Sequence, residues 1–248
     1  MNTAKTTLVI GASGGIGSAL CAAWQGDGAE RVIGVSRNPV PESLAHSTDS
    51  LTWYQTDYSA ASITRCAQRI IADTASAGLS VTRICICNGI LHAGDIKPEK
   101  RLEQINADHI MKVLEVNSIT PVMWFTALLP LIPAKQRCVI TTFSARIGSI
   151  GDNRSGGWYS YRASKAALNM FMQSASIEMA RRFPLTKLVA FHPGTTDTSL
   201  SRPFQANVKQ QDLLQADYVA DALVNIMNTI EVDGKLSFID WEGKSIEW

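Results

Sequence analysis

The sequence predicts an α/β protein with one doubly wound, mostly parallel sheet of about seven strands and helices on both faces. Two observations predict this class. Short apolar runs alternate along the chain with longer segments whose apolar residues recur at helical spacing, as in strand–helix–strand units. No linker, internal repeat or low-complexity run divides the 248 residues. We therefore expect a single domain over residues 1–248.

Seven segments have the length and composition of strands. Strands that are buried on both faces read as nearly continuous apolar runs, and Val81–Cys87 largely does. The predicted strands are Thr6–Ile10, Arg31–Ser36, Leu51–Thr56, Val81–Cys87, Cys138–Phe143, Lys187–Phe191 and Lys235–Ile239.

Three segments between the strands carry an apolar stripe at helical spacing, which we interpret as core packing. The first helix follows the first strand, and Gly26-Asp27-Gly28 supplies its stop signal. Right-handed crossovers between these strands give one doubly wound sheet. In such a sheet, ligands are expected at the carboxyl ends of the strands. The stripes are Ile16, Leu20, Ala23 and Trp24; Leu168, Phe171, Met172, Ala175 and Met179; and Ala216, Val219, Ala220, Leu223, Met227 and Ile230.

Charge and composition argue against several classes of protein. The 23 basic and 22 acidic residues give a net charge of +1, whereas a nucleic-acid-binding protein needs a strongly basic face. The most apolar stretch, Val122–Ile132, is too short to span a bilayer, and Met1–Thr7 lacks the apolar core of a signal peptide. The five cysteines and four histidines show no metal-ligand spacing. We expect a cytoplasmic protein with reduced, buried cysteines, no metal and no membrane partner.

A glycine-rich stretch, Ile10–Gly17, joins the first strand to the first helix and contains the spacing Gly11-x-x-x-Gly15-x-Gly17. Glycines at such a junction let backbone N–H groups approach a diphosphate at the positive end of the helix dipole. The alternative is a tight structural turn. A nucleoside-triphosphate loop is excluded because no Gly-Lys-Ser/Thr follows. The context favours a dinucleotide site that includes Gly11, Ser13, Gly14, Gly15, Ile16 and Gly17.

The end of the second strand predicts which dinucleotide binds. A site that prefers NAD(H) usually places Asp or Glu here, but this chain has Ser36 and then Arg37. A guanidinium can bind a 2′-phosphate with two hydrogen bonds, so we predict NADP(H) over NAD(H). The alternative for Arg37 is a solvated surface residue. Asp57, after the third strand, is a candidate adenine contact, with a helix cap as its alternative.

Tyr161 and Lys165 are four residues apart and therefore share one face of a helix. A nearby ammonium favours the phenolate, so we expect Lys165 to lower the pKa of Tyr161. Such a pair can pass a proton to or from a substrate oxygen while a nicotinamide exchanges hydride with the adjacent carbon. The alternative is a solvated helix pair. Tyr159 has Ala163 four residues on and cannot take this role.

The glycine spacing, Asn117 in Val-Asn-Ser, the Tyr161/Lys165 pair and Pro193–Thr198 occur in this order along the chain. Together they resemble the short-chain dehydrogenase/reductase family over essentially the whole sequence. The segments Ser144–Ile150, Gly156–Asn169 and Asp240–Gly243 are most similar to the C-factor-like and sniffer-like carbonyl reductases. The resemblance implies a Rossmann fold and an NADP(H)-dependent oxidoreductase that acts on a small carbonyl or alcohol.

The resemblance also implies roles for individual residues. Tyr161 would be the general acid for carbonyl reduction, and Lys165 would hold the nicotinamide ribose. Asn117 would hold a water in a proton relay. Ser199–Gln215 matches the place of a mobile substrate lid. A homodimer or tetramer is implied as well. The loop facing the nicotinamide and the phosphates would include Pro193, Gly194, Thr196 and Thr198.

Three departures from the family pattern affect the site. The family usually has two serines after the fifth strand, and the second bonds the substrate oxygen; here Ser144 is followed by Ala145. We assign the catalytic hydroxyl to Ser144, with Ser149 as a weaker alternative. Gly89 fits the Asn-Asn-Ala-Gly pattern of the fourth strand, but Asn88 falls one place late, and both are assigned to the cofactor site. An insertion around Asp152–Gly157 is expected to reshape one wall of the substrate cleft.

Two functions of different classes follow. The first is an NADP(H)-dependent oxidoreductase for a carbonyl or alcohol on an apolar substrate. The second is a nucleotide-binding signalling protein that keeps the fold and turns over little or nothing, which the missing second serine and the C-factor likeness support.

Overall fold

The seven predicted strands form one parallel sheet in the computed structural model, which describes residues 5–25, 31–45 and 50–248. The strand order is β3-β2-β1-β4-β5-β6-β9, and every pair is parallel. The predicted fold class is therefore confirmed. The strands are β1 (Lys5–Ile10), β2 (Arg31–Ser36), β3 (Leu51–Gln55), β4 (Ser80–Ile86), β5 (Cys138–Phe143), β6 (Thr186–His192) and β9 (Leu236–Asp240).

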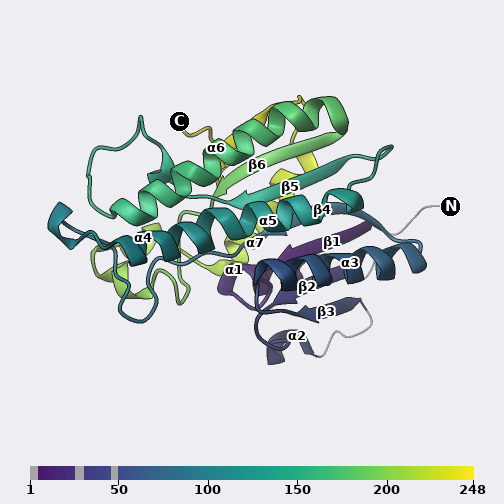
Figure 1. The fold of residues 1–248 in the computed structure, drawn as a ribbon, viewed down its shortest axis with the longest axis horizontal. Helices are drawn as coiled ribbons and strands as arrows, with labels where there is room; N and C mark the ends of the chain where they lie inside the picture. The colour runs from purple at the N-terminus through teal and green to yellow at the C-terminus, as the bar shows by residue number, and fades with distance from the viewer. Residues whose placement is uncertain (1–4, 26–30, 46–49) are drawn as a thin grey trace.

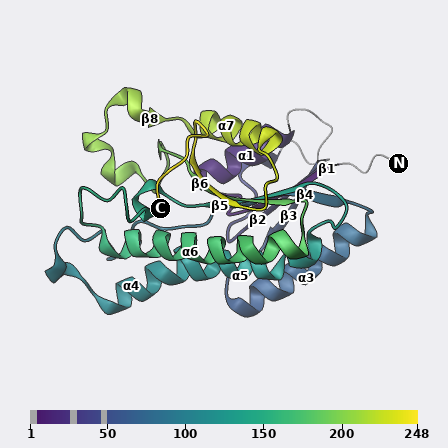
Figure 2. The same ribbon diagram turned by 90° about the horizontal axis from the view of Figure 1, so that it is seen from above.

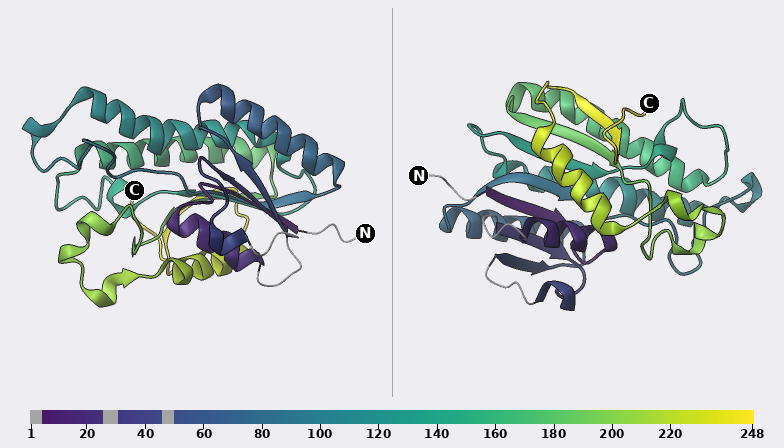
Figure 3. Two further views of the ribbon diagram at one scale, coloured as in Figure 1. Left: turned by 90° about the horizontal axis from the view of Figure 1, so that it is seen from below. Right: turned by 180° about the vertical axis from the view of Figure 1, so that it is seen from behind.

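Helices cover both faces of the sheet, as Figure 2 shows. One layer contains α3 (Ala60–Ser76), α4 (Ala107–Leu114), α5 (Thr120–Ala127) and the long α6 (Tyr159–Arg182). The other layer contains α1 (Gly15–Gln25) and α7 (Ala216–Thr229), which pack against each other (Figure 3). A short α2 (Glu42–Ala45) lies beyond β2. The predicted stop Gly26-Asp27-Gly28 lies outside the described residues.

The core is split into two apolar clusters, one under each helical layer. Leu8 and Ile10 of β1 face one cluster and Val9 faces the other, so the strand is apolar on both sides, as expected for a sheet covered on both faces. Two of the three predicted stripes are buried or half-buried along their length. The second is partly wrong, because Phe171 is 46% exposed while Leu168 and Met172 are buried.

Two irregular features lie between the main elements. A π-helical turn, Glu115–Ile119, joins α4 to α5, and Asn117 sits within it. The two-residue strands β7 (Thr195–Thr196) and β8 (Leu213–Leu214) pair with each other and tie together the ends of the segment that follows β6. Figure 2 shows β8 at the same end of the molecule as the start of α6.

Within the described ranges, no helix is both long enough and apolar enough to cross a membrane. Of the five cysteines, four are buried and Cys87 is half-buried, and none forms a disulfide. The predicted burial is thus confirmed for all but Cys87.

Candidate active site

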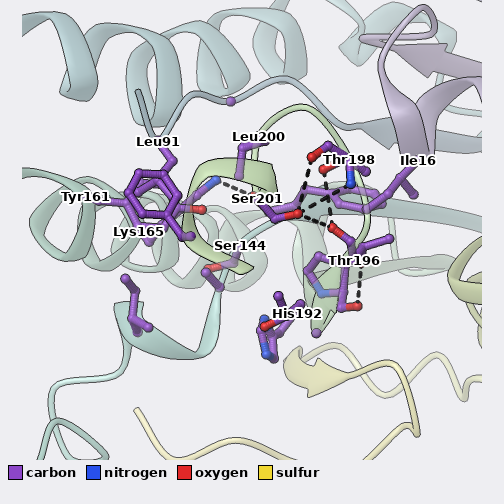
Figure 4. A pocket seen from close by; sticks show the side chains of 18 of the residues that line it. Ile16, Leu91, Ser144, Tyr161, Lys165, His192, Thr196, Thr198, Leu200 and Ser201 are labelled. Carbon is purple, nitrogen blue, oxygen red and sulfur yellow. Dashed lines mark hydrogen bonds between the residues drawn. The ribbon is translucent and has the colours of Figure 1, made fainter. Parts of the chain in front are cut away.

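A cavity of about 260 Å³ lies at the carboxyl ends of the central strands, where a doubly wound sheet binds its ligands. In the view of Figure 4, Tyr161 and Lys165 lie on one side and Thr196, Thr198 and Ser201 on the other. The structure thus brings together the start of α1, the ends of β4 and β5, the start of α6 and the segment after β6. The predicted site residues that line the cavity are Ile16, Asn88, Gly89, Ser144, Tyr161, Lys165, Pro193, Gly194, Thr196 and Thr198.

The glycine loop packs so tightly that its three motif glycines are required. A Cβ on Gly17 would lie 2.2 Å from the Gly11 carbonyl oxygen, and a Cβ on Gly15 would lie 2.5 Å from Cγ2 of Thr198. Gly11 itself has a φ of +82°, which side chains disfavour. Gly15 opens α1, and the first N–H groups of a helix have no partner within it, so the loop can receive a diphosphate.

Tyr58 holds this loop in place and was not found by sequence reasoning. Its hydroxyl accepts a hydrogen bond from the Gly11 N–H at 2.9 Å and donates one to the Val35 carbonyl at 3.1 Å. Tyr58 has a φ of +66°, a conformation that only a few per cent of non-glycine residues adopt. The N–H groups of Gly11, Ala12 and Gly14 are all donated within the fold, the latter two to the carbonyls of Val35 and Gly11. A diphosphate would therefore use the N–H groups of the opening turn of α1.

A second cavity of about 330 Å³ adjoins the glycine loop and is lined by Ser13, Ser36, Arg37, Asn38 and Asp57 among others. The Asn38 side chain donates to the Ser13 hydroxyl at 3.3 Å, and the Asn38 N–H donates to the Ser36 hydroxyl at 3.1 Å. Arg37 is exposed at the rim of this polar cluster. Asp57 accepts the Ser59 N–H at 2.8 Å, but the N-cap of α3 is Ser59 itself, so the helix-cap alternative for Asp57 is wrong. Its assignment as an adenine contact stays a prediction.

Tyr161 and Lys165 lie on the first turns of α6 and face the cavity, as their spacing predicted. The Lys165 Nζ donates to the Phe143 carbonyl at 2.7 Å and lies 5.8 Å from the centre of the Tyr161 ring. Burial raises the pKa of Tyr161 to about 12 and lowers the pKa of Lys165 to about 8. The expected lowering of the Tyr161 pKa by Lys165 is therefore wrong, because desolvation of the phenol dominates.

Ser144 and Ala145 both line the cavity at the end of β5. The Ser144 hydroxyl is buried and donates to Oδ1 of Asn169 at 2.6 Å. Asn169 lies on α6, one turn beyond Lys165. The assignment of Ser144 as the catalytic hydroxyl stays a prediction. A substrate oxygen would have to compete with Asn169 for the Ser144 proton. Ser149, the weaker alternative, accepts the Asp152 N–H at 2.9 Å.

Asn117 is fully buried in the π-helical turn, and its side chain is already bonded. Its Nδ2 donates to the Ile90 carbonyl at 2.8 Å and to the Ser164 hydroxyl at 3.0 Å, while its Oδ1 accepts the Ile90 N–H at 2.7 Å. The side chain thus fixes the β4 loop against α6. Both protons of the Asn117 amide are already donated, so a relay water there would have to bind one of the oxygens of this residue.

The loop after β6 closes the cavity beside His192, which sequence reasoning placed only as a surface or core residue. Burial lowers the pKa of His192 to about 4, so its imidazole is neutral at pH 7. Its ring packs edge-on against Trp241 at 5.7 Å. Gly194 needs its φ of +71°, and a Cβ there would lie 2.7 Å from Leu214 and 2.8 Å from Trp241.

Aromatic residues form one wall of the cavity. The Trp158 ring lies edge-on to Phe204 at 5.3 Å and to Tyr161 at 6.3 Å, measured between ring centres. Trp158 directly follows the insertion expected at Asp152–Gly157, and Phe204 lies in the segment expected to be a lid. A tryptophan after two glycines was visible in the sequence, but nothing local showed which way its ring would point.

Among the residues that the structure describes, no group of histidine, cysteine, aspartate and glutamate could hold a metal ion. The site combines a glycine loop at a helix start, a polar cluster with an arginine, and a half-buried phenol beside a buried lysine.

Comparisons with known proteins point to one family. A family model described as short chain dehydrogenase matches residues 5–209. The 1-hydroxy-2-glutathionyl-2-methyl-3-butene dehydrogenase of Rhodococcus sp. (strain AD45) is 29% identical over 163 residues, which cover 65% of this chain and 68% of that protein. The C-signal protein of Myxococcus xanthus is 25% identical over 147 residues, 59% of this chain and 83% of that protein.

A solved structure shares the fold over nearly its whole length. The NADPH-bound carbonyl reductase from chicken fatty liver superimposes with a TM-score of 0.81 at 22% identity, covering 99% of this chain and 100% of that one.

Proposed function

The chain belongs to the short-chain dehydrogenase family of oxidoreductases, and from this premise we propose that it is an NADP(H)-dependent carbonyl reductase. The observation that carries the proposal is the placement of Tyr161 and Lys165 in one cavity with Ile16, at the end of the glycine loop, and with the Pro193–Thr198 loop. The adjoining cavity, which the glycine loop lines, shares Asn88 and Gly89 with it. Phenol, ammonium and dinucleotide cradle are the groups that hydride exchange with a carbonyl requires.

The residues present fit a bound NADP(H). The opening turn of α1 would hold the diphosphate, the Ser13–Ser36–Asn38 cluster and Arg37 would hold the 2′-phosphate, and Lys165 would hold the nicotinamide ribose. When bound, the dinucleotide supplies the hydride. The NADPH bound to the chicken carbonyl reductase supports this choice over NAD(H).

Tyr161 is proposed as the proton donor in reduction. With a pKa of about 12 its hydroxyl stays protonated at neutral pH, ready to give its proton to the carbonyl oxygen as the alcohol forms. Lys165, charged below its pKa of about 8, would stabilise the phenolate left behind. Asn117 holds the loop that carries Ile90 against α6 and, through its main-chain carbonyl, would hold the water that returns the proton.

The cavity walls favour an apolar substrate. Leu91, Ile147, Trp158 and Phe204 line it, so a charged substrate would lose its hydration without gaining a partner from these side chains. Leu200, Ser201, Phe204 and Val208 enter the cavity from residues 199–215. We therefore propose this segment as a substrate lid over a single domain, in a protein that works in the cytoplasm.

The assay that tests the proposal combines purified protein and NADPH with a panel of quinones, aldehydes, ketones and dicarbonyls. We expect NADPH oxidation that depends on at least one carbonyl. Binding of NADPH by calorimetry without turnover of any compound would instead support the signalling function, which the 25% identity to the C-signal protein keeps as the second candidate.

Arg37→Ala is expected to change which dinucleotide binds. Losing one charge-assisted contact to the 2′-phosphate, worth about 1.5–3 kcal/mol, should lower the NADPH-to-NADH affinity ratio by roughly 10–150-fold. Titration calorimetry with both dinucleotides measures the ratio. Arg181→Ala, an exposed arginine at the far end of α6, is the matched control for net charge and should leave the ratio unchanged. An unchanged ratio in Arg37→Ala would remove the basis for the NADP(H) preference.

The outer face of α5 and α6 is proposed to pair two copies of the chain. Met170, Phe171 and Ile177 on α6 are 67%, 46% and 55% exposed, and Ile119 at the start of α5 is 47% exposed. Apolar residues gathered on one face commonly mark an interface between subunits. We expect a dimer or tetramer by light scattering, and a monomer after Met170→Glu combined with Ile177→Glu. A wild-type monomer at micromolar concentration would contradict this proposal.

A further inference from the structure

The helix that carries Tyr161 and Lys165 begins without a cap of its own. Trp158, the residue before α6, makes no side-chain capping bond, and the first turn contains no acidic residue. The first N–H groups of a helix need partners, and a helix start favours a negative charge. α6 has 24 residues, so its opening turn has to be stabilised from elsewhere in the chain.

Glu99 supplies that partner from the long connection between β4 and α4. It is only 5% exposed. Its carboxylate accepts two hydrogen bonds from Ser160, one from the N–H at 3.2 Å and a very short one from the hydroxyl, across 61 positions of sequence. Its main-chain carbonyl accepts the Trp158 N–H at 2.5 Å. Ser160 immediately precedes Tyr161, so these hydrogen bonds fix the turn of α6 that carries the phenol.

The backbone before α6 could not hold its shape without such contacts. Gly156, Gly157 and Trp158 are three successive residues with positive φ, at 61°, 65° and 52°. A non-glycine residue in this region is strained and persists where surrounding contacts over-determine it. Arg162 also holds this segment, because its side chain donates to the Gly157 carbonyl at 3.0 Å and to the Gly156 carbonyl at 3.2 Å.

We propose that Glu99 is a positioning residue for the reaction. It acts through Ser160 and Trp158 to set where the Tyr161 hydroxyl stands relative to Lys165 and the substrate. Ser160 presents two donors, and a carboxylate offers an acceptor oxygen to each of them. Its negative charge also interacts favourably with the positive end of the helix dipole. This inference rests on the proposed function, since it assigns a task within the same site.

Replacing Glu99 tests the inference, because its effect on kcat should be much larger than its effect on the affinity for NADPH. A shift of about 1 Å at the reacting group can cost about 10²-fold, so Glu99→Ala should lower kcat by roughly that factor. The affinity for NADPH, measured by calorimetry, should change by less than about 2-fold, because the glycine loop is untouched. Glu99→Gln keeps the size and one acceptor oxygen, and should fall between Glu99→Ala and wild type.

Asn106→Ala is the matched control. Asn106 caps α4 by accepting the His109 N–H at 3.1 Å, and α4 carries no residue that we place at the proton transfer. Removing either partner should lower the midpoint of urea unfolding, but Asn106→Ala should leave kcat unchanged. Equal kcat values for Glu99→Ala, Glu99→Gln and wild type would overturn the proposal and show that Glu99 only stabilises the helix.

Hydrogen–deuterium exchange separates this inference from the proposed function. In Glu99→Gln, amides of the first turn of α6 should exchange faster than in wild type, while those near Met172 and Met179 should not. If wild type reduces no carbonyl, the proposed function fails and the exchange result still decides whether Glu99 holds this turn. Unchanged exchange at the first turn would contradict the inference whatever the activity.

Discussion

Replacing Tyr161 with phenylalanine is expected to lower kcat for carbonyl reduction by about 10²–10⁴, the usual contribution of a positioned acid. The change removes the hydroxyl whose pKa of about 12 keeps its proton available for the substrate oxygen. The ring keeps its contact with Trp158, so the cavity should retain its shape. Steady-state NADPH oxidation with the best carbonyl of the panel measures the effect, and calorimetry should show nearly unchanged NADPH affinity.

The chain provides a matched control two residues away. Tyr159→Phe makes the same chemical change on the same helix, at a residue outside the cavity lining. We expect its kcat to stay within about 2-fold of wild type, as for a substitution away from the reacting groups. Equal losses in the two variants would mean that Tyr161 is not the proton donor. An unchanged kcat in both variants would mean that another group donates the proton.

Replacing Lys165 with methionine is expected to lower kcat/KM by about 10²–10³, the effect of removing one positioned charge from a site. The same change should make the cofactor-free protein more stable at pH 7. Lys165 is 3% exposed, and burial lowers its pKa to about 8. Below pH 8 the native protein carries this buried charge at a cost of about 3 kcal/mol, which methionine avoids.

The stabilising effect should depend on pH in a definite direction. Between about pH 8 and the ordinary lysine value near 10.5, the unfolded chain binds more protons than the native protein, so wild-type stability rises with pH. Lys165→Met lacks that rise. It also loses the bond to the Phe143 carbonyl, worth about 1–1.5 kcal/mol. We expect a net gain of about 1–2 kcal/mol at pH 7 that disappears by about pH 10.

Urea unfolding of both proteins at pH 7 and pH 10 measures this difference. Lys135→Met, at an exposed lysine, is the control and should stay within about 0.5 kcal/mol of wild type at both values. A Lys165→Met protein that is less stable than wild type by the same amount at both pH values would show that burial does not lower the pKa of Lys165.

Local patterns were enough to predict the elements of the fold. All seven strands of the main sheet were predicted to within one residue at both ends, because continuous apolar runs between helical segments indicate strands covered on both faces. The glycine loop and the Tyr161/Lys165 pair were also predictable. Both depend on short spacings. A strand–helix junction fixes the geometry of the glycine loop, and one helix face fixes that of the pair.

Contacts between distant segments could not be predicted in the same way. Glu99 meets Ser160 across 61 positions, and Tyr58 reaches Gly11 across 47. Ser144 was predicted as the catalytic hydroxyl, and its hydrogen bond to Asn169 of α6 could not be foreseen from the sequence. Phe171 belongs to an apolar stripe whose spacing does not show which of its members turns outward. None of these partners leaves a signal near its own position in the chain.

The class of fold, the dinucleotide cradle and the two side chains of the proposed proton transfer could all be predicted from local patterns, because each follows from spacing within one or two adjacent elements. The tertiary structure decided how those groups behave. Burial, which depends on what packs around a residue, raises the pKa of Tyr161 instead of letting Lys165 lower it. Packing also brings Glu99 to the start of α6 and His192 to the cavity.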